Sequence, residues 1–232
     1  MPEGNCFHYD QAAVDHLARK DKKLAAAMQA IGPVRREVMP DLFQALMHAI
    51  TGQQISMAAQ RTVWGRLCGL LGEVTPQALL AQPQTALQAL GLSARKVDYM
   101  RGIARQVVDG ELDLPGMTAL EDAEVCRRLA ALRGIGVWTA EMLLLFSLQR
   151  SDILSYDDLA IRRGLRMLYR HKEMPRERFE RYRRRFSPYG SLASLYLWAI
   201  AGGALPELDD PAERKKGRSR PAASLKSTVT KD

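Results

Sequence analysis

The most informative stretch of the chain reads Leu132-Arg133-Gly134-Ile135-Gly136-Val137-Trp138-Thr139-Ala140. Two glycines around one apolar residue permit a tight hairpin between one helical pattern and the next. The helix that follows such a hairpin presents unpaired backbone amides at its N-terminus, and these amides bind a phosphate without a side-chain charge. Taken alone, the stretch indicates either a plain corner between two core helices or a phosphate-binding hairpin.

Helical periodicity extends to both sides of this stretch. Apolar residues recur at three-and-four spacing over 42–50 and the pattern stops at Gly52. Period-two alternation is nowhere sustained, so we predict an all-α fold. Further helices are expected over 75–90 with Thr75 as cap and Pro76 as first residue, over 93–107 with Ser93 as cap, and over 118–132 with a capping box of Thr118 and Glu121.

Composition and charge narrow the function. The chain has 232 residues and a formal net charge of +8, an excess that suits a polyanion such as nucleic acid or a merely solvated face. Its 3 cysteines lie far apart and cannot supply a four-cysteine iron–sulfur cluster. The 4 histidines show no zinc-binding spacing. Neither a metalloenzyme nor a disulfide-stabilised protein is indicated.

The ends of the chain carry separate signals. The first residues lack the basic-then-apolar layout of a signal peptide and no apolar run is long enough to span a membrane, so we expect a cytoplasmic protein without a membrane partner. From about Asp209 the composition shifts to Lys, Arg, Ser and Pro, which predicts a disordered basic tail over 209–232.

A second motif, Ser155-Tyr156-Asp157-Asp158, opens another helical pattern about twenty residues after the hairpin. Ser155 and Asp158 fit a capping box, and carboxylates suit the positive end of a helix dipole, so a structural role explains the pair. The other interpretation is that the pair includes a catalytic carboxylate, and these residues taken alone leave both interpretations open.

Together these segments resemble the helix-hairpin-helix GPD superfamily of DNA glycosylases, in particular its alkylbase branch of 3-methyladenine DNA glycosylase II type. The resemblance spans about residues 10 to 205. The matching blocks are Ile50-Thr51-Gly52-Gln53-Gln54-Ile55-Ser56, Gly91-Leu92-Ser93 with Lys96, Leu132 to Ala140, Asp157-Asp158, and Pro188-Tyr189-Gly190-Ser191-Leu192-Ala193 leading to Trp198.

The resemblance implies a particular architecture. It predicts a glycosylase domain over 1–208 whose two helical lobes flank a DNA-binding cleft. The central lobe is expected over about 42–150, and the second lobe combines the N-terminal segment with 156–208. This protein would be a monomer that binds double-stranded DNA containing alkylated bases.

The resemblance also implies an activity, namely extrusion of an alkylated base and hydrolysis of its N-glycosidic bond to leave an abasic site. Asp158 would be the catalytic carboxylate, and Asp157 would support the start of the helix. The base pocket would contain Trp138, Trp198, Gln53 and Met142. DNA would be contacted by Gln54, Ile55, Ser56, Lys96, Gly134, Ile135, Gly136, Val137 and Thr139, with Gln54 or Ile55 filling the gap in the duplex. No cofactor is required, although backbone carbonyls of Ala130, Leu132 and Gly134 would hold a Na⁺ or K⁺ ion.

Three alternatives remain open at this stage. An endonuclease III-like glycosylase/lyase would need a lysine where Trp138 stands and commonly carries an iron–sulfur cluster. A noncatalytic DNA-binding module would keep the hairpin without the chemistry, and a helical protein-interaction domain would carry its basic charge incidentally. The sequence also departs from the family at Arg133, where Pro is usual, at Met142, where some members have an aromatic residue, and at Gly190, where Arg is common.

Overall fold

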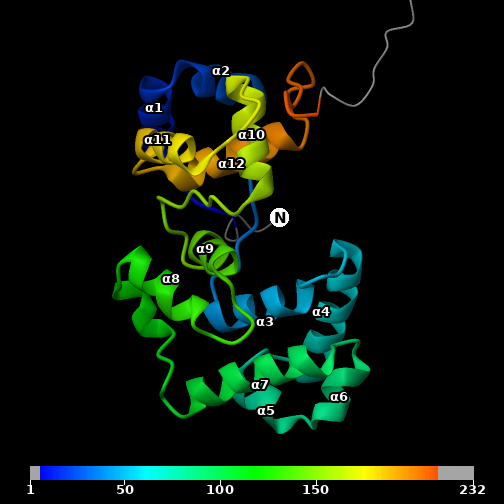
Figure 1. Ribbon diagram of the computed structural model, residues 1–232. Helices are drawn as coiled ribbons and strands as arrows, with labels where there is room; N and C mark the ends of the chain where they lie inside the picture. The colour runs from blue at the N-terminus through cyan, green and yellow to red at the C-terminus, as the bar shows by residue number, and fades with distance from the viewer. Residues whose placement is uncertain (1–5, 214–232) are drawn as a thin grey trace, which may run out of the picture.

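The computed structural model describes residues 6–213, and its regular elements are helical (Figure 1). Twelve α-helices and one short 3₁₀-helix follow one another within this range, and strand-type pairing in it is limited to an isolated antiparallel bridge between Cys6 and Glu37. The prediction of an all-α fold is therefore confirmed. No helix among these residues is long and apolar enough to cross a membrane.

One group of helices combines the two ends of the chain (Figure 1, top). The N-terminal helices pack against helices from the last third of the sequence. Two of the later helices approach closely at Gly164, where a Cβ atom would lie 2.4 Å from the carbonyl oxygen of Leu197, so only glycine fits there. The members are α1 (Gln11–Lys20), α2 (Lys22–Ile31), α10 (Leu159–Tyr169), α11 (Arg176–Phe186) and α12 (Gly190–Ala201).

The middle of the sequence forms a second group (Figure 1, bottom). The members are α3 (Leu42–Gly52), α4 (Met57–Leu71), α5 (Pro76–Ala81), α6 (Gln84–Ala89), α7 (Ala94–Val108), the 3₁₀-helix η1 (Pro115–Ala119) and α8 (Asp122–Ala130). Three of its helices pack together, α3 on both α4 and α7, and Ile50, Leu67 and Met100 on them are completely buried.

Helix α9 (Val137–Phe146) lies between the two groups and packs on both α8 and α3 (Figure 1). The connection from α2 to α3 runs past its C-terminal end, where the amide of Met39 donates a hydrogen bond to the carbonyl of Phe146 at 2.9 Å. The mean hydropathy of α9 is high and four of its residues are buried, as expected for a central helix. Residues that precede and follow α9 are thus held at the junction of the groups.

Two local predictions were wrong in their boundaries. The helix expected over 75–90 is divided at Pro83, which has no amide hydrogen to continue α5 and instead becomes the N-cap of α6. The capping box of Thr118 and Glu121 does not form. Thr118 lies inside η1 and its hydroxyl donates to the Pro115 carbonyl, while Glu121 precedes α8 without a side-chain capping bond. The caps at Thr75 and Ser93 are confirmed.

The boundary of the basic tail also needs correction. Asp210 is only 4% exposed and accepts a hydrogen bond from Nε of Arg166 in α10 at 3.0 Å. This ion pair fastens residues 209–213 to the helical body, because a buried carboxylate requires such a partner. The rest of the predicted tail, 214–232, lies outside the described residues.

Candidate active site

The glycine hairpin joins α8 to α9, as its sequence predicted. Gly134 has φ +90°, in the region that favours glycine, and a Cβ atom on it would lie 2.3 Å from Cδ2 of Tyr99. Gly136 is the N-cap of α9, with φ −92°. The amides of the first turn of α9 therefore begin directly after the hairpin, where they have no partners inside the helix.

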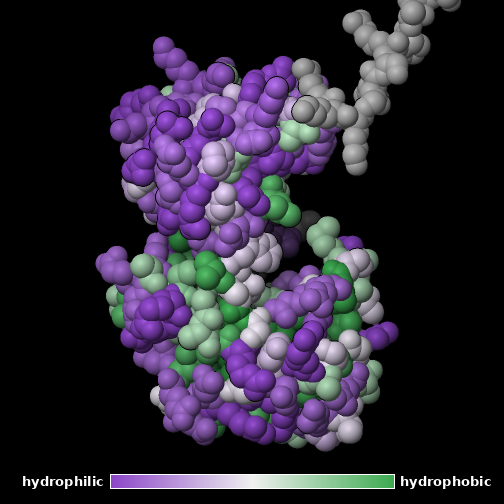
Figure 2. Space-filling view, in the orientation of Figure 1, coloured by the Kyte–Doolittle hydropathy of each residue, from purple (hydrophilic) through white to green (hydrophobic). Residues whose placement is uncertain are grey.

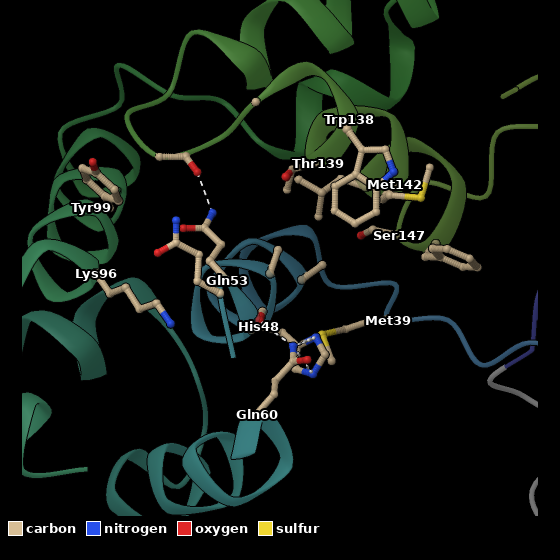
Figure 3. A pocket seen from close by; sticks show the side chains of 18 of the residues that line it. Met39, His48, Gln53, Gln60, Lys96, Tyr99, Trp138, Thr139, Met142 and Ser147 are labelled. Atoms are coloured by element: carbon tan, nitrogen blue, oxygen red, sulfur yellow. Dashed lines mark hydrogen bonds between the residues drawn. The ribbon is translucent and has the colours of Figure 1, made fainter. Parts of the chain in front are cut away.

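The turn between α3 and α4 lies next to this hairpin. Nε2 of Gln53 donates a hydrogen bond to the carbonyl of Gly134 at 2.7 Å (Figure 3). Gln54 has φ +59°, and Ser56 caps α4 by accepting a hydrogen bond from the amide of Ala59 at 3.2 Å. Ile55 is 40% exposed at the tip. The structure thus places two separately predicted DNA-contacting segments side by side.

A cavity of about 750 Å³ opens between these segments and is lined by residues of α3, α4, α7, the hairpin and α9. Figure 2 shows a hollow between the two groups of helices. One end is largely apolar, and its lining includes Met39, Trp138, Met142, Leu143 and Phe146 (Figure 3). The other end is polar, and its lining includes Gln53, Gln54, Ser93, Arg95, Lys96 and Tyr99. His48 and Gln60 lie between the two ends (Figure 3). Such a volume accommodates a flat heterocycle together with part of its backbone.

Two titratable groups in the cavity wall are affected by burial. Lys96 donates a hydrogen bond from Nζ to the carbonyl of Thr51 at 2.9 Å, and desolvation lowers its pKa. Desolvation also lowers the pKa of His48, whose ring lies 3.2 Å from the amide nitrogen of Gln60. The imidazole is therefore uncharged at neutral pH.

Asp158 lies at the N-terminal end of α10 and is 7% exposed. Its Oδ1 accepts a hydrogen bond from the amide of Ile161 at 2.8 Å and another from Nε1 of Trp198 at 3.1 Å. Its Oδ2 accepts a hydrogen bond from Nε1 of Trp138 at 3.0 Å. Three N–H donors converge on this carboxylate, and together they fix its direction.

Asp158 itself is the N-cap of α10, so the prediction that Asp157 supports the helix start was wrong. Asp157 is exposed to solvent. The capping box predicted from Ser155 and Asp158 does not form either, because Asp158 occupies the N-cap position that the box assigns to Ser155. Only Oδ1 of Asp158 contacts the helix amide. Oδ2 faces the indole of Trp138.

The four residues predicted for the base pocket are not equivalent. Trp138, Gln53 and Met142 line the cavity, whereas Trp198 is absent from its lining and stacks on Phe146 with ring centroids 5.5 Å apart. Arg36 lies over the Trp198 ring at 5.9 Å. Trp198 therefore supports the apolar end from behind and contacts Asp158 directly.

The predicted DNA-contacting residues also separate by exposure. Val137 and Trp138, in the first turn of α9, are 51% and 46% exposed, whereas Ile135 is 5% exposed and packs into the core. Ile135 would therefore contribute its backbone and not its side chain. Thr139, like Lys96 and Gly136, lines the cavity.

Sequence reasoning missed several residues of the site. Phe146 follows Met142 by four residues on α9, a spacing that signals the same helix face. Tyr99 follows Lys96 by three residues in the same way. Met39, His48 and Gln60 gave no local signal, since they reach the cavity through contacts between distant segments.

Two departures from the family pattern have physical explanations. A Cβ atom on Gly190 would lie 2.8 Å from Oδ1 of Asp152, which accepts a hydrogen bond from the Gly190 amide at 3.0 Å, so a larger residue does not fit. The guanidinium of Arg133 lies 5.7 Å from the centre of the Tyr99 ring and adds positive charge to the hairpin.

Comparison with known proteins agrees with this geometry. A family described as HhH-GPD superfamily base excision DNA repair protein matches residues 47–188, and the chain belongs to this superfamily. DNA-3-methyladenine glycosylase 1 of Schizosaccharomyces pombe is 29% identical over 209 residues, which cover 87% of this chain and 91% of the relative.

Solved structures give the same assignment. A DNA-3-methyladenine glycosidase from Bacillus halodurans superimposes with a TM-score of 0.79 and 34% identity, covering 88% of this chain and 95% of that chain. A 3-methyladenine DNA glycosylase of Schizosaccharomyces pombe in complex with abasic DNA superimposes with a TM-score of 0.71 and 30% identity, covering 81% of this chain and 95% of that chain. The function of the chain is thus base excision from DNA.

Proposed function

We propose that the protein is a monofunctional glycosylase for alkylated bases of the 3-methyladenine type. It extrudes the damaged nucleotide from duplex DNA, holds the base in the cavity and hydrolyses the N-glycosidic bond, leaving an abasic site. The substrate class is supported by the names of the relatives. The observation that carries the chemistry is Asp158, a carboxylate held by two indole N–H groups beside an aromatic cavity and the hairpin helix.

The chemistry needs little beyond a well-placed anion. A purine alkylated at N3 or N7 carries positive charge and departs readily, so the transition state resembles a sugar cation. The Asp158 carboxylate stabilises that cation, and the same group is able to accept a proton from the attacking water. Trp138 and Met142 offer polarisable surfaces to an electron-poor base.

DNA is held by groups outside the reacting bond. The amides at the start of α9 bind a backbone phosphate, and Gln54 or Ile55 at the α3–α4 turn occupies the space that the extruded nucleotide leaves. The exposure of Ile55, 40%, and of its neighbour Met57, 80%, supports an apolar contribution to this wedge.

A monovalent cation at the hairpin is part of the proposal. The carbonyls of Leu132 and Gly134 each accept one hydrogen bond, from the amide of Ile135 at 3.0 Å and from Gln53 at 2.7 Å. A carbonyl oxygen has two lone pairs, so each retains one for a cation, and Ala130 is the last residue of α8, where carbonyls lack helical partners. Na⁺ or K⁺ held there would add positive charge facing a DNA phosphate.

The remaining expectations follow from the same reading. The protein acts as a monomer on duplex DNA in the cytoplasm. Lys96 is the lysine in the cavity lining, and its amine is engaged by the Thr51 carbonyl, which disfavours a lyase mechanism through a lysine imine. A noncatalytic DNA-binding module is the competing hypothesis.

The direct test is incubation with duplex DNA methylated by a simple alkylating agent, followed by mass identification of released bases. We expect free 3-methyladenine in the supernatant and alkali-labile abasic sites in the DNA. A protein that binds the methylated duplex but releases no base would show that the fold serves binding alone.

A further inference from the structure

We propose that Trp138 is a positioning residue that aims Oδ2 of Asp158 at the reacting sugar, in addition to contacting the base. The inference rests on the proposed function, because it concerns how the same carboxylate acts. It assigns different tasks to the two carboxylate oxygens and to the two tryptophans that contact them.

The two oxygens of Asp158 differ in their remaining hydrogen-bonding capacity. Each carboxylate oxygen offers two lone pairs. Oδ1 uses both of them, for the Ile161 amide at 2.8 Å and the Trp198 indole at 3.1 Å. Oδ2 uses one, for the Trp138 indole at 3.0 Å. The second lone pair of Oδ2 is therefore the one left for a sugar cation or a water molecule.

Trp138 lies where the base site meets this oxygen. Its ring lines the cavity (Figure 3), whereas Asp158 is not part of the lining. Because Nε1 of the same ring donates to Oδ2, the indole stands at the boundary between the cavity and the carboxylate. A base in the cavity therefore lies beside the ring, and the sugar attached to that base lies on the side of the N–H group and Oδ2. One side chain thus contacts both partners of the bond that breaks.

The indole has the properties that such a positioning role requires. It donates through Nε1 and accepts nothing, so it cannot remove a proton from the water or compete with the carboxylate as a base. Trp138 is 46% exposed, so its orientation is set largely by this hydrogen bond and by its contacts along the cavity wall. A bound base would restrict the ring further and with it the direction of Oδ2.

Trp198 has a different task in this scheme. Its indole saturates Oδ1, which the Ile161 amide already holds, and its ring stacks on Phe146 away from the cavity lining. Loss of the Trp198 N–H leaves Oδ1 with the helix amide, whereas loss of the Trp138 N–H leaves Oδ2 with no protein donor among the described residues. The two losses should therefore differ in effect.

The kinetic test compares Trp138→Phe, Trp198→Phe and, as a matched control, Trp64→Phe, whose ring packs edge-on against His48 at 5.0 Å. Phenylalanine keeps an aromatic face but has no N–H. We expect Trp138→Phe to lower kcat on methylated duplex about 10- to 100-fold, the effect of a lost charge-assisted hydrogen bond, with KM changed by less than about threefold. Trp198→Phe should lose less than Trp138→Phe, and Trp64→Phe should match the wild type.

An independent readout uses the indole resonances. The chain has 3 tryptophans, so a nitrogen–proton correlation spectrum contains three indole peaks, which the three phenylalanine variants assign. In Asp158→Asn, the asparagine oxygen is expected to keep the N-cap bond to Ile161, which turns its NH₂ group towards Trp138. The Trp138 indole proton should then move upfield most, that of Trp198 less, and that of Trp64 not at all.

The outcomes separate this inference from the proposed function. If the wild type releases no methylated base, the proposed function is wrong. If the wild type is active but Trp138→Phe keeps its kcat, Trp138 serves only as a stacking surface and the inference fails. If Trp138→Phe does not fold, the spectrum of Asp158→Asn decides: an unmoved Trp138 peak overturns the positioning role and a shifted one supports it.

Discussion

Replacement of Gly134 by alanine should destabilise the protein through two separate effects at the hairpin. Its φ of +90° is a conformation that a residue with a Cβ atom adopts at a cost of about 1–2 kcal/mol. The new Cβ would also lie 2.3 Å from Cδ2 and 2.8 Å from Cγ of Tyr99, near the root of the ring, where rotation gives no escape. Overpacking of this kind costs about 1–3 kcal/mol, so we expect a total loss of about 2–5 kcal/mol.

Thermal unfolding followed by circular dichroism measures this loss. For a chain of this size, about 2–5 kcal/mol corresponds to a fall in Tm of about 4–20 °C. Gly136→Ala is the matched control, because Gly136 has φ −92° and a Cβ atom there would meet no atom within 4 Å. Combining Gly134→Ala with Tyr99→Ala should recover the steric part only. If Gly134→Ala melted within about 1 °C of the wild type, the strained hairpin would not exist as described.

The remaining predictions concern the DNA, pH and the reaction course. Deletion of 214–232 removes the cluster Arg214, Lys215, Lys216, Arg218 and Arg220 and should weaken binding to any duplex. The slope of log K against log salt should fall by about 0.9 for each lost phosphate contact, while single-turnover excision at saturating enzyme stays intact. A loss of lesion selectivity would contradict this prediction. The half-buried His48 has a pKa below its ordinary value of 6.5, so it takes up a proton more readily when the chain is unfolded. Stability should therefore decline as pH falls below about 6.5, and His48→Gln should reduce that decline in Tm measurements; an unchanged pH dependence would mean that His48 is not responsible. Borohydride added during turnover should trap no covalent protein–DNA adduct, because Trp138 stands where a lyase needs an amine; efficient trapping would overturn the hydrolytic mechanism.

The hairpin and the catalytic candidate were predictable because their signals are local. Glycine spacing at Gly134 and Gly136 needs no knowledge of distant residues, and the carboxylate pair Asp157-Asp158 was visible before an amphipathic helix, although only the family resemblance selected Asp158 for catalysis. The error over Asp157 has the same origin. Two adjacent carboxylates compete for the N-cap position, and only the backbone geometry selects the one whose oxygen reaches the amide of Ile161.

The features that could not be predicted from the sequence depend on contacts between distant segments. Met39 reaches the cavity because its amide bonds to Phe146, more than a hundred residues later. Residues 209–213 are held against the helices by the ion pair of Asp210 with Arg166 of α10. Composition does not reveal this contact, so it assigned these residues to the tail. The division at Pro83, in contrast, was readable from the sequence, because proline within a helical pattern ends the helix before it.

The central claim is that Asp158 performs hydrolysis in a protein that releases alkylated bases, and one comparison tests it most directly. Single-turnover release of methylated base is measured for Asp158→Asn and Asp157→Asn, with duplex affinity measured in parallel. Asp158→Asn preserves the shape and the cap but removes the charge, so we expect release to be abolished while affinity stays within several-fold. Asp157→Asn, at an exposed position, should remain active. Equal losses in both variants, or wild-type turnover by Asp158→Asn, would contradict the account.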